Sequence, residues 1–260
     1  ALTRRLGGRG FNHTKVDVRR RAATLVVTSD LEGLSSALPA PFGKSADARW
    51  PLRIESRPVP AASPDQRPAR DTLTVALRDD VRLVFERERD AGSQQLTVRR
   101  GAFALADAPT LPDRGFAVLL RTPHIDLDAW NALLGDEWLA RPRAGAGEGF
   151  SLLPDTVSLV AGSVGVAGKS LHDVVLGASR TDGFWRANIH AREIDGYFNW
   201  RQAGPGETQG TLVARFARLE IPRDRIDDFE TLLDTTPEAL PALDVAAEEL
   251  ILNDHRLGAL

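Results

Sequence analysis

The stretch Thr72-Leu73-Thr74-Val75-Ala76-Leu77-Arg78 carries the clearest structural signal in the chain, because strongly apolar side chains recur at every second position. After Asp79-Asp80 the alternation resumes, with Val81, Leu83 and Phe85 set against Arg82 and Glu86. A period of two places successive side chains on opposite faces of a β-strand. The two runs therefore predict a hairpin with one apolar face and one polar face.

The same alternation continues beyond this hairpin. A polar turn with Asp90 and Gly92 leads to apolar positions at Leu96, Val98, Phe103 and Leu105. In the second half, Trp185, Ala187, Ile189 and Ala191 follow the turn Thr181-Asp182-Gly183, whose Asp-Gly pair is typical of hairpins. Further strands are expected at 23–28, 50–55, 157–159, 174–178, 195–200, 211–218, 243–245 and 250–252. The chain is therefore predicted to be mainly β, with the first runs forming a β-meander.

Two short helices are expected to interrupt the strands. Asp126 or Asp128 is a suitable N-cap for a helix that carries Trp130, Leu133 and Leu134 on one face, and Asp224 is one for a helix that carries Ile226, Phe229, Leu232 and Leu233. The Gly-rich stretch 141–150 is interpreted as a flexible loop or a seam. This divides the chain into a first part of the sheet at 1–140 and its continuation at 151–260.

Composition excludes several classes of protein. The chain has 260 residues with 42% apolar side chains, which is enough for a core, but it has no cysteine. Disulfides, Cys-ligated zinc, iron–sulfur clusters and thiol nucleophiles are thereby excluded. Sixteen prolines and no run of 18 apolar residues argue against helical bundles and a membrane-spanning helix. Methionine is absent and residue 1 is Ala1, so we expect the chain to be part of something longer.

Charge is distributed unevenly along the chain. Residues 1–21 carry seven Arg or Lys against Asp17, a net charge of +6, whereas residues 220–254 carry eleven Asp or Glu against two Arg, a net charge of −9. A basic arm is able to meet phosphate on nucleic acid or on lipid headgroups. A solvated, frayed end is the favoured interpretation, and no nucleic-acid motif supports the alternative, so no nucleic-acid partner is expected.

The chemistry-bearing motifs are incomplete. Gly168-Lys169-Ser170 and Gly43-Lys44-Ser45 end like a Walker A loop but lack its first glycine, since Ser163 and Leu38 stand there. His124, Asp126 and Asp128 have the spacing for a metal site on a strand. A helix N-cap at Asp126 or Asp128 accounts for the same residues without a metal. Carboxylate pairs such as Glu86 and Glu88 give no sign of an opposed catalytic pair. We therefore expect no catalytic residues, no metal, no cofactor and no enzyme activity.

Several longer stretches resemble one protein family. These are Ser29-Asp30-Leu31-Glu32-Gly33-Leu34, Leu38-Pro39-Ala40-Pro41-Phe42-Gly43-Lys44, Trp50-Pro51-Leu52, Ile125-Asp126-Leu127-Asp128-Ala129-Trp130, Phe184-Trp185-Arg186-Ala187-Asn188-Ile189, Gly196-Tyr197-Phe198-Asn199-Trp200, Ala214-Arg215-Phe216-Ala217-Arg218-Leu219-Glu220-Ile221-Pro222 and Leu240-Pro241-Ala242-Leu243-Asp244-Val245. In this order they are similar to the large YhdP-like proteins of the AsmA superfamily in Gram-negative bacteria. The motifs concern packing and turns, and together they cover nearly the whole chain.

The resemblance implies a fold and a function. It implies a long antiparallel, strongly curved open β-sheet that forms an apolar groove across the periplasm and conducts phospholipid between the inner and outer membranes. An inner-membrane anchor would lie outside this internal or C-terminal-half piece. The expected partners are phospholipid acyl chains, the inner membrane through that anchor, and other envelope proteins.

The expected lining of the groove follows the apolar positions of the strands. The residues are Leu73, Val75, Leu77, Leu83, Phe85, Val157, Leu159, Val174, Leu176, Trp185, Ile189, Leu212 and Phe216. Periodicity alone leaves a second architecture open, a β-sandwich that packs its apolar faces shut and acts as a structural or interaction module of the envelope. A third and weaker hypothesis is a sugar-handling enzyme that uses tryptophan and carboxylate side chains.

Overall fold

The computed structural model shows a mainly β protein. It describes residues 5–19, 22–59, 70–90, 92, 95–134, 150–201, 210–221, 242–252 and 255–259. Strands account for 68% of the residues that the structure describes. The chain divides into two compact units, Ala1–Asp155 and Thr156–Leu260. Of the predicted seam at 141–150 only Phe150 lies within the described residues, and the predicted helix at Asp224 lies outside them.

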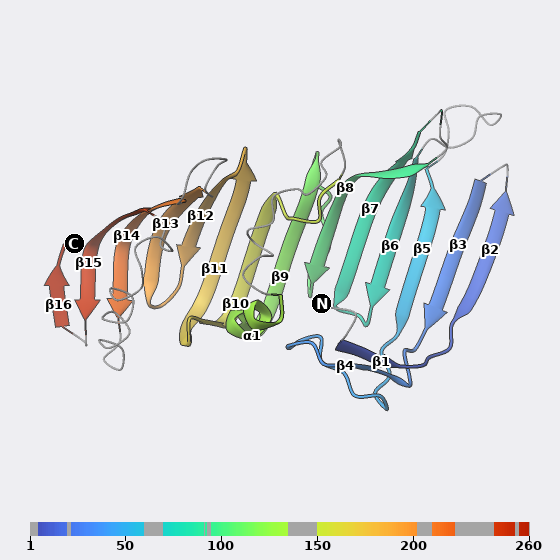
Figure 1. The fold of residues 1–260 in the computed structure, drawn as a ribbon, viewed down its shortest axis with the longest axis horizontal. Helices are drawn as coiled ribbons and strands as arrows, with labels where there is room; N and C mark the ends of the chain where they lie inside the picture. The colour runs from blue at the N-terminus through green and yellow to red at the C-terminus, as the bar shows by residue number, and fades with distance from the viewer. Residues whose placement is uncertain are drawn as a thin grey trace. The chain divides into compact units, whose positions relative to one another are not determined.

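The first unit is built on an open sheet of seven strands in the order β2-β3-β5-β6-β7-β8-β9 (Figure 1). Its strands are β2 (His13–Arg19), β3 (Ala22–Ser29), β5 (Leu52–Pro58), β6 (Arg70–Leu77), β7 (Val81–Arg89), β8 (Leu96–Leu105) and β9 (Gly115–Asp126). Neighbours are antiparallel except for β8 and β9, which are parallel. Leu73 pairs with Phe85, Val75 with Leu83 and Leu77 with Val81, so the predicted hairpin is confirmed.

The second unit repeats this design with seven strands in the order β10-β11-β12-β13-β14-β15-β16. They are β10 (Thr156–Val166), β11 (Lys169–Thr181), β12 (Phe184–His190), β13 (Ile194–Arg201), β14 (Thr211–Ile221), β15 (Ala242–Leu252) and β16 (His255–Gly258). Asp182 and Gly183 both have positive φ, as the predicted two-residue hairpin turn requires. The predicted fold class, mainly β with an open and largely antiparallel sheet, is confirmed.

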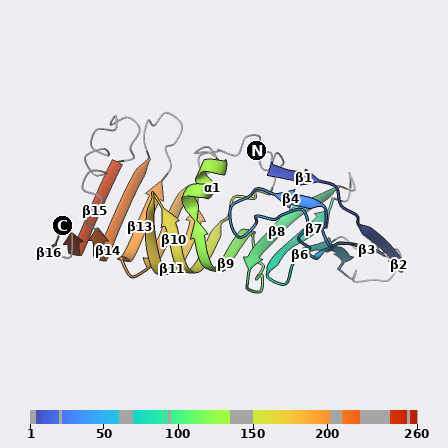
Figure 2. The same ribbon diagram turned by 90° about the horizontal axis from the view of Figure 1, so that it is seen from below.

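A short second layer lies on one face of the first unit's sheet. It consists of the two-stranded sheet of β1 (Leu6–Gly8) and β4 (Leu34–Ser36), together with the helix α1 (Leu127–Leu134). Figure 2 shows β1, β4 and α1 on the same side of the strands. Asp126 accepts a hydrogen bond from the Ala129 amide at 2.9 Å, which confirms the predicted cap and helix.

The structure corrects several expectations. The residues at 13–19, interpreted from charge as a frayed arm, form strand β2, because Val16 and Val18 alternate with Lys15 and Asp17. The runs at 243–245 and 250–252 belong to one strand, β15. β14 and β15 are parallel, like β8 and β9. The described strands of each unit form one main sheet, so the alternative of a β-sandwich with two large facing sheets is not the architecture.

The connection between β8 and β9 explains how two strands consecutive in sequence become parallel. Arg100, whose side chain pairs with Glu86, donates a hydrogen bond to the carbonyl oxygen of Pro112 at 3.1 Å, so residues 106–114 return on the face that carries Arg100. Ala102 and Ala104 share that face and are 0% exposed. We infer that the returning segment covers these small side chains, which leaves the opposite face free of the crossover.

Candidate functional site

Five of the predicted lining residues share one face of the first unit. Register pairing places Leu73, Val75 and Leu77 of β6 beside Phe85, Leu83 and Val81 of β7. Each of the five predicted side chains is half-buried. Their sequence neighbours on these strands, such as Thr74 and Arg82, point to the opposite face.

This apolar face extends across neighbouring strands of the unit. Following the register of Val75 and Leu83 from strand to strand gives a line that we call the central row. It consists of Val27, Ile54, Val75, Leu83, Phe103 and Val118, contributed by β3, β5, β6, β7, β8 and β9. Every member is apolar. The row runs perpendicular to the strands, so an apolar surface continues from one strand to the next.

The remaining eight predicted residues share one face of the second unit. Leu159, Leu176 and Ile189 are register partners across β10, β11 and β12. The same face carries Trp185, which pairs with Trp200, and Trp200 pairs with Leu212. Val157, Val174 and Phe216 complete the set. Val174 is 1% exposed whereas Val175 is 51% exposed, which shows how completely the two faces differ.

The opposite faces are charged and paired. In the first unit, Arg100 donates to Glu86 at 2.7 Å, and this hydrogen bond holds the pKa of Glu86 below its ordinary value despite partial burial. In the second unit, Arg215 donates to Asp244 at 2.8 Å and lowers the pKa of that carboxyl. Each sheet therefore has an apolar face and a charged face that is readily solvated.

One charged pair does lie on the apolar face of the first unit. Asp71 is in register with Arg87, and the guanidinium donates to both carboxylate oxygens at 2.8 and 2.6 Å. Ser56 donates to Asp71 and accepts from Arg87, each at 2.9 Å. Three N–H groups of Arg87 and both carboxylate oxygens of Asp71 are therefore hydrogen-bonded within the face. It marks the edge of the apolar surface at one end of β6 and β7.

The other edge is covered by residues 30–50, which we call the lobe. Its ends meet where the Trp50 amide donates to the Asp30 carbonyl oxygen at 2.7 Å. Lys44 is only 9% exposed, because its ammonium donates to the carbonyl oxygens of Leu34 and Ser45. Phe42 at the tip of the lobe contacts Phe103 of the central row, with ring centroids 6.4 Å apart.

The motifs considered as chemistry have structural roles. Ala167 and Gly168, both with positive φ, form the turn between β10 and β11, so Gly168-Lys169-Ser170 is a hairpin and not a phosphate loop. The buried ammonium of Lys44 likewise holds the lobe together. His172 of β11 and Glu193 of the turn between β12 and β13 form a close pair at 2.6 Å. Within the described ranges, no group of three or more His, Asp or Glu is arranged to hold a metal ion.

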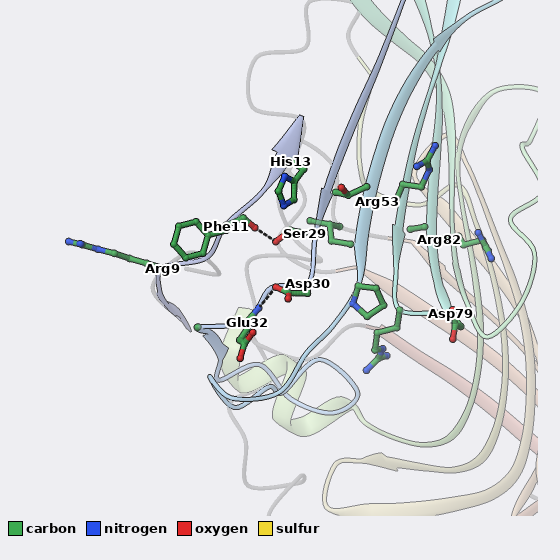
Figure 3. A pocket seen from close by; sticks show the side chains of 15 residues that line it. Arg9, Phe11, His13, Ser29, Asp30, Glu32, Arg53, Asp79 and Arg82 are labelled. Atoms are coloured by element: carbon green, nitrogen blue, oxygen red, sulfur yellow. Dashed lines mark hydrogen bonds between the residues drawn. The ribbon is translucent and has the colours of Figure 1, made fainter. Parts of the chain in front are cut away.

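A cavity of about 810 Å³ lies at the polar side of β2 to β7 (Figure 3). Its lining contains one register row of the charged face, namely His13, Thr28, Arg53, Ala76 and Arg82. Asp30, Glu32 and Asp79 also line it, so the charges are mixed. In Figure 3, Arg9 extends away from the other labelled side chains. The cavity therefore draws mainly on the charged face of the sheet and combines side chains of both charges.

The aromatic residues that cover the lining could not be identified from the sequence pattern. Phe42, Trp130 and Phe150 lie in loops or in the helix, where no period of two marks them. Phe103, Phe116, Val27 and Ile54 belong to the apolar face, and Val27, Ile54 and Phe103 lie in runs expected to be strands.

None of the described helical segments has the length and apolarity needed to cross a bilayer.

Comparison with known protein families gives a match over the whole chain. The family model described as YhdP protein matches residues 1–260, which is the whole chain. No curated protein and no solved structure gives a significant match.

Proposed function

Because the chain belongs to the YhdP family, we propose that it acts as part of a periplasmic lipid-conducting protein. Its apolar faces shield phospholipid acyl chains from water during transport between the inner and outer membranes, and an anchor outside these residues holds the protein in the inner membrane. The family is a transport family and not an enzyme family, and membership implies a cell-envelope protein. The observation that carries the proposal is the unbroken apolar central row.

The physical argument rests on the hydration of acyl chains. Each methylene group exposed to water is unfavourable by about 0.8 kcal/mol, so a chain of about sixteen carbons faces a barrier on the order of 10 kcal/mol. An apolar face that continues from strand to strand removes most of this barrier. The seven strands of each unit are separated by six steps of about 4.8 Å, or about 29 Å in all. One leaflet of hydrocarbon is about 15 Å thick, so either unit is long enough for one chain.

The first test is lipid content. The 260-residue chain is purified from bacteria without detergent and examined by native mass spectrometry and lipid extraction. We expect the wild type to carry phospholipid. Val75→Asp combined with Leu83→Asp places two carboxylates side by side in the central row, and we expect that variant to carry little or none.

The matched control changes the next residue on the same strand. Ala76→Asp lies on the opposite face in register with Arg53 and Arg82, where a carboxylate is electrostatically favourable. We expect this variant to keep its lipid, and circular dichroism checks that each variant is folded. A wild-type chain that is free of lipid and melts cooperatively would contradict the proposal, as would equal lipid loss in Ala76→Asp.

A further inference from the structure

Aromatic side chains from outside the sheet lie on the apolar face of the first unit at two successive positions of strand β8. The positions are Phe103 and Gly101, which are two residues apart and therefore share the face. One cover comes from the lobe and helix α1, and the other comes from residue 150.

The first cover is a layer of three rings. Phe42 lies between Phe103 and Trp130, with centroid distances of 6.4 Å and 5.8 Å, and its contact with Trp130 is edge-on. Backbone oxygens of the lobe hold the layer in place. Trp130 donates from its indole nitrogen to the Ala40 carbonyl oxygen at 3.3 Å, and Arg78 donates to the Pro41 carbonyl oxygen at 3.1 Å.

The second cover lies over Gly101. Phe85 and Phe116 flank this glycine in register, and their rings stack with centroids 6.0 Å apart. Phe150 meets both rings edge-on, at 5.7 Å and 6.0 Å. Asp155 anchors the segment, because its carboxylate accepts from the Phe116 amide at 2.9 Å and its own amide donates to the Phe116 carbonyl oxygen at 2.7 Å.

We propose that these two covers form a neck, made of Phe42 and Trp130 on one side and Phe150 on the other, which an acyl chain parts when it passes strand β8. This inference rests on the proposed function. The two covers lie side by side on β8, since Gly101 and Phe103 are successive positions of one face. The segment that carries Phe150 is held at the start of β9 by the hydrogen bonds of Asp155 with Phe116. The central row reaches β8 at Phe103, the ring that Phe42 contacts, so a chain that follows the row must displace Phe42. The ring edges and faces present only apolar surface to such a chain.

The neck is held closed by contacts that are individually weak. An aromatic pair changes an equilibrium by about two- to tenfold beyond the area that it buries. Contacts of this size keep the neck closed when it is empty and yield to an acyl chain, which offers the same rings equivalent apolar contact. The neck therefore sets how fast lipid moves past β8, while the sheet determines whether lipid binds.

Opening is testable with one fluorescent label, because the chain has no native cysteine. Phe42→Cys is labelled with bimane, whose emission is quenched by contact with a tryptophan, here Trp130. Phosphatidylglycerol vesicles are added and emission is followed. We expect emission to rise as lipid enters, and we expect the Trp130→Phe version to start bright and to stay unchanged.

The outcomes separate the neck from the proposed function. Lipid bound to the protein with unchanged bimane emission overturns the neck and leaves lipid shielding intact. Absence of bound lipid in the extract overturns the proposed function itself, and the neck with it.

A second measurement uses unlabelled protein loaded with a dansyl phospholipid, whose release into acceptor vesicles is timed. Phe42→Ala and Phe150→Ala are each expected to speed release by about two- to tenfold. Phe184→Ala is the matched control, because Phe184 is 47% exposed and in register with Thr181 and Arg201 on the polar face. Release at the wild-type rate in both neck variants overturns the proposal.

Discussion

Gly101 shows how one residue shapes the apolar face. A Cβ atom there would lie 2.5 Å from Cδ1 and 2.7 Å from Cε1 of Phe85. We expect Gly101→Ala to lower the free energy of unfolding by about 1 to 3 kcal/mol, because the stacked rings must move apart. The check is urea denaturation, with Gly177→Ala on β11 as control, since a Cβ atom added there would meet no neighbouring atom within 4 Å. Equal losses in the two variants would contradict the packing argument.

The pair of His172 and Glu193 makes stability depend on pH. Burial raises the pKa of Glu193, but hydrogen bonds from the His172 amide and ring at 2.8 and 2.6 Å act against it, and the pKa lies below its ordinary value. A carboxyl with a lowered native pKa stabilises the fold above its ordinary pKa of 4.5, and the stabilisation is lost as pH falls through the lowered native value.

We therefore expect Glu193→Gln to be less stable than the wild type near neutral pH, and the difference to shrink as the solution is acidified to about pH 3. Urea denaturation at a series of pH values measures it. Asp173→Asn is the control, because the ion pair of Asp173 with Arg192 is exposed and contributes little. A constant difference across the series would exclude this origin.

At the scale of the elements, the pair of Asp71 and Arg87 defines where the apolar surface of β6 and β7 ends. Removing one partner leaves the other charge partly buried, so Asp71→Ala is expected to lower the free energy of unfolding by about 3 kcal/mol. Asp71→Val with Arg87→Leu removes both charges and is expected to restore most of that loss. Chemical denaturation of the wild type, Asp71→Ala and the double variant measures these differences. A double variant as unstable as Asp71→Ala would contradict the expectation that the unpaired charge causes the loss.

Helix α1 depends on its cap in a similar way. Asp126 accepts from the Ala129 amide, and Trp130 of the same helix packs on Phe42. Asp126→Ala is expected to lower the free energy of unfolding by about 1 kcal/mol. In the bimane-labelled Phe42→Cys protein, it should also raise emission before any lipid is added. Asp128→Ala is the comparison. Emission that stays quenched in Asp126→Ala would show that the position of Trp130 does not depend on the helix cap.

The strands were predictable where polar and apolar residues alternate, as in β6, β7 and β12, because that period directly reflects the two faces of a sheet. Strand β2 has the same signal in Lys15-Val16-Asp17-Val18, but its charges suggested a solvated arm. The lobe and the neck have no such signal. Phe42 reaches Phe103 through the fold of the lobe, and the meeting of Asp71 with Arg87 depends on the register of two strands.

At the scale of the whole molecule, each unit carries its own apolar face, so the proposed lipid shielding predicts a separate contribution of each unit to lipid content. Leu176→Asp in the second unit is expected to lower the phospholipid bound per protein without abolishing it, because the first unit is unchanged. Val175→Asp, one residue away on the opposite face and 51% exposed at that position, should have no effect. Phosphorus analysis of lipid extracts measures both. Equal losses would show that the charge acts through stability and not through the face.

The succession of the strands also has a consequence for how such a chain comes to be folded. In the main sheet of each unit, every strand pairs with the next described strand in sequence, apart from β3, which pairs with β5 across the lobe. Contacts are therefore local in sequence, as in repeat proteins, and each added strand completes the hydrogen bonding of the one before it. A chain delivered from its N-terminus can thus build the sheet strand by strand, each new strand pairing with the edge left by the strand before it.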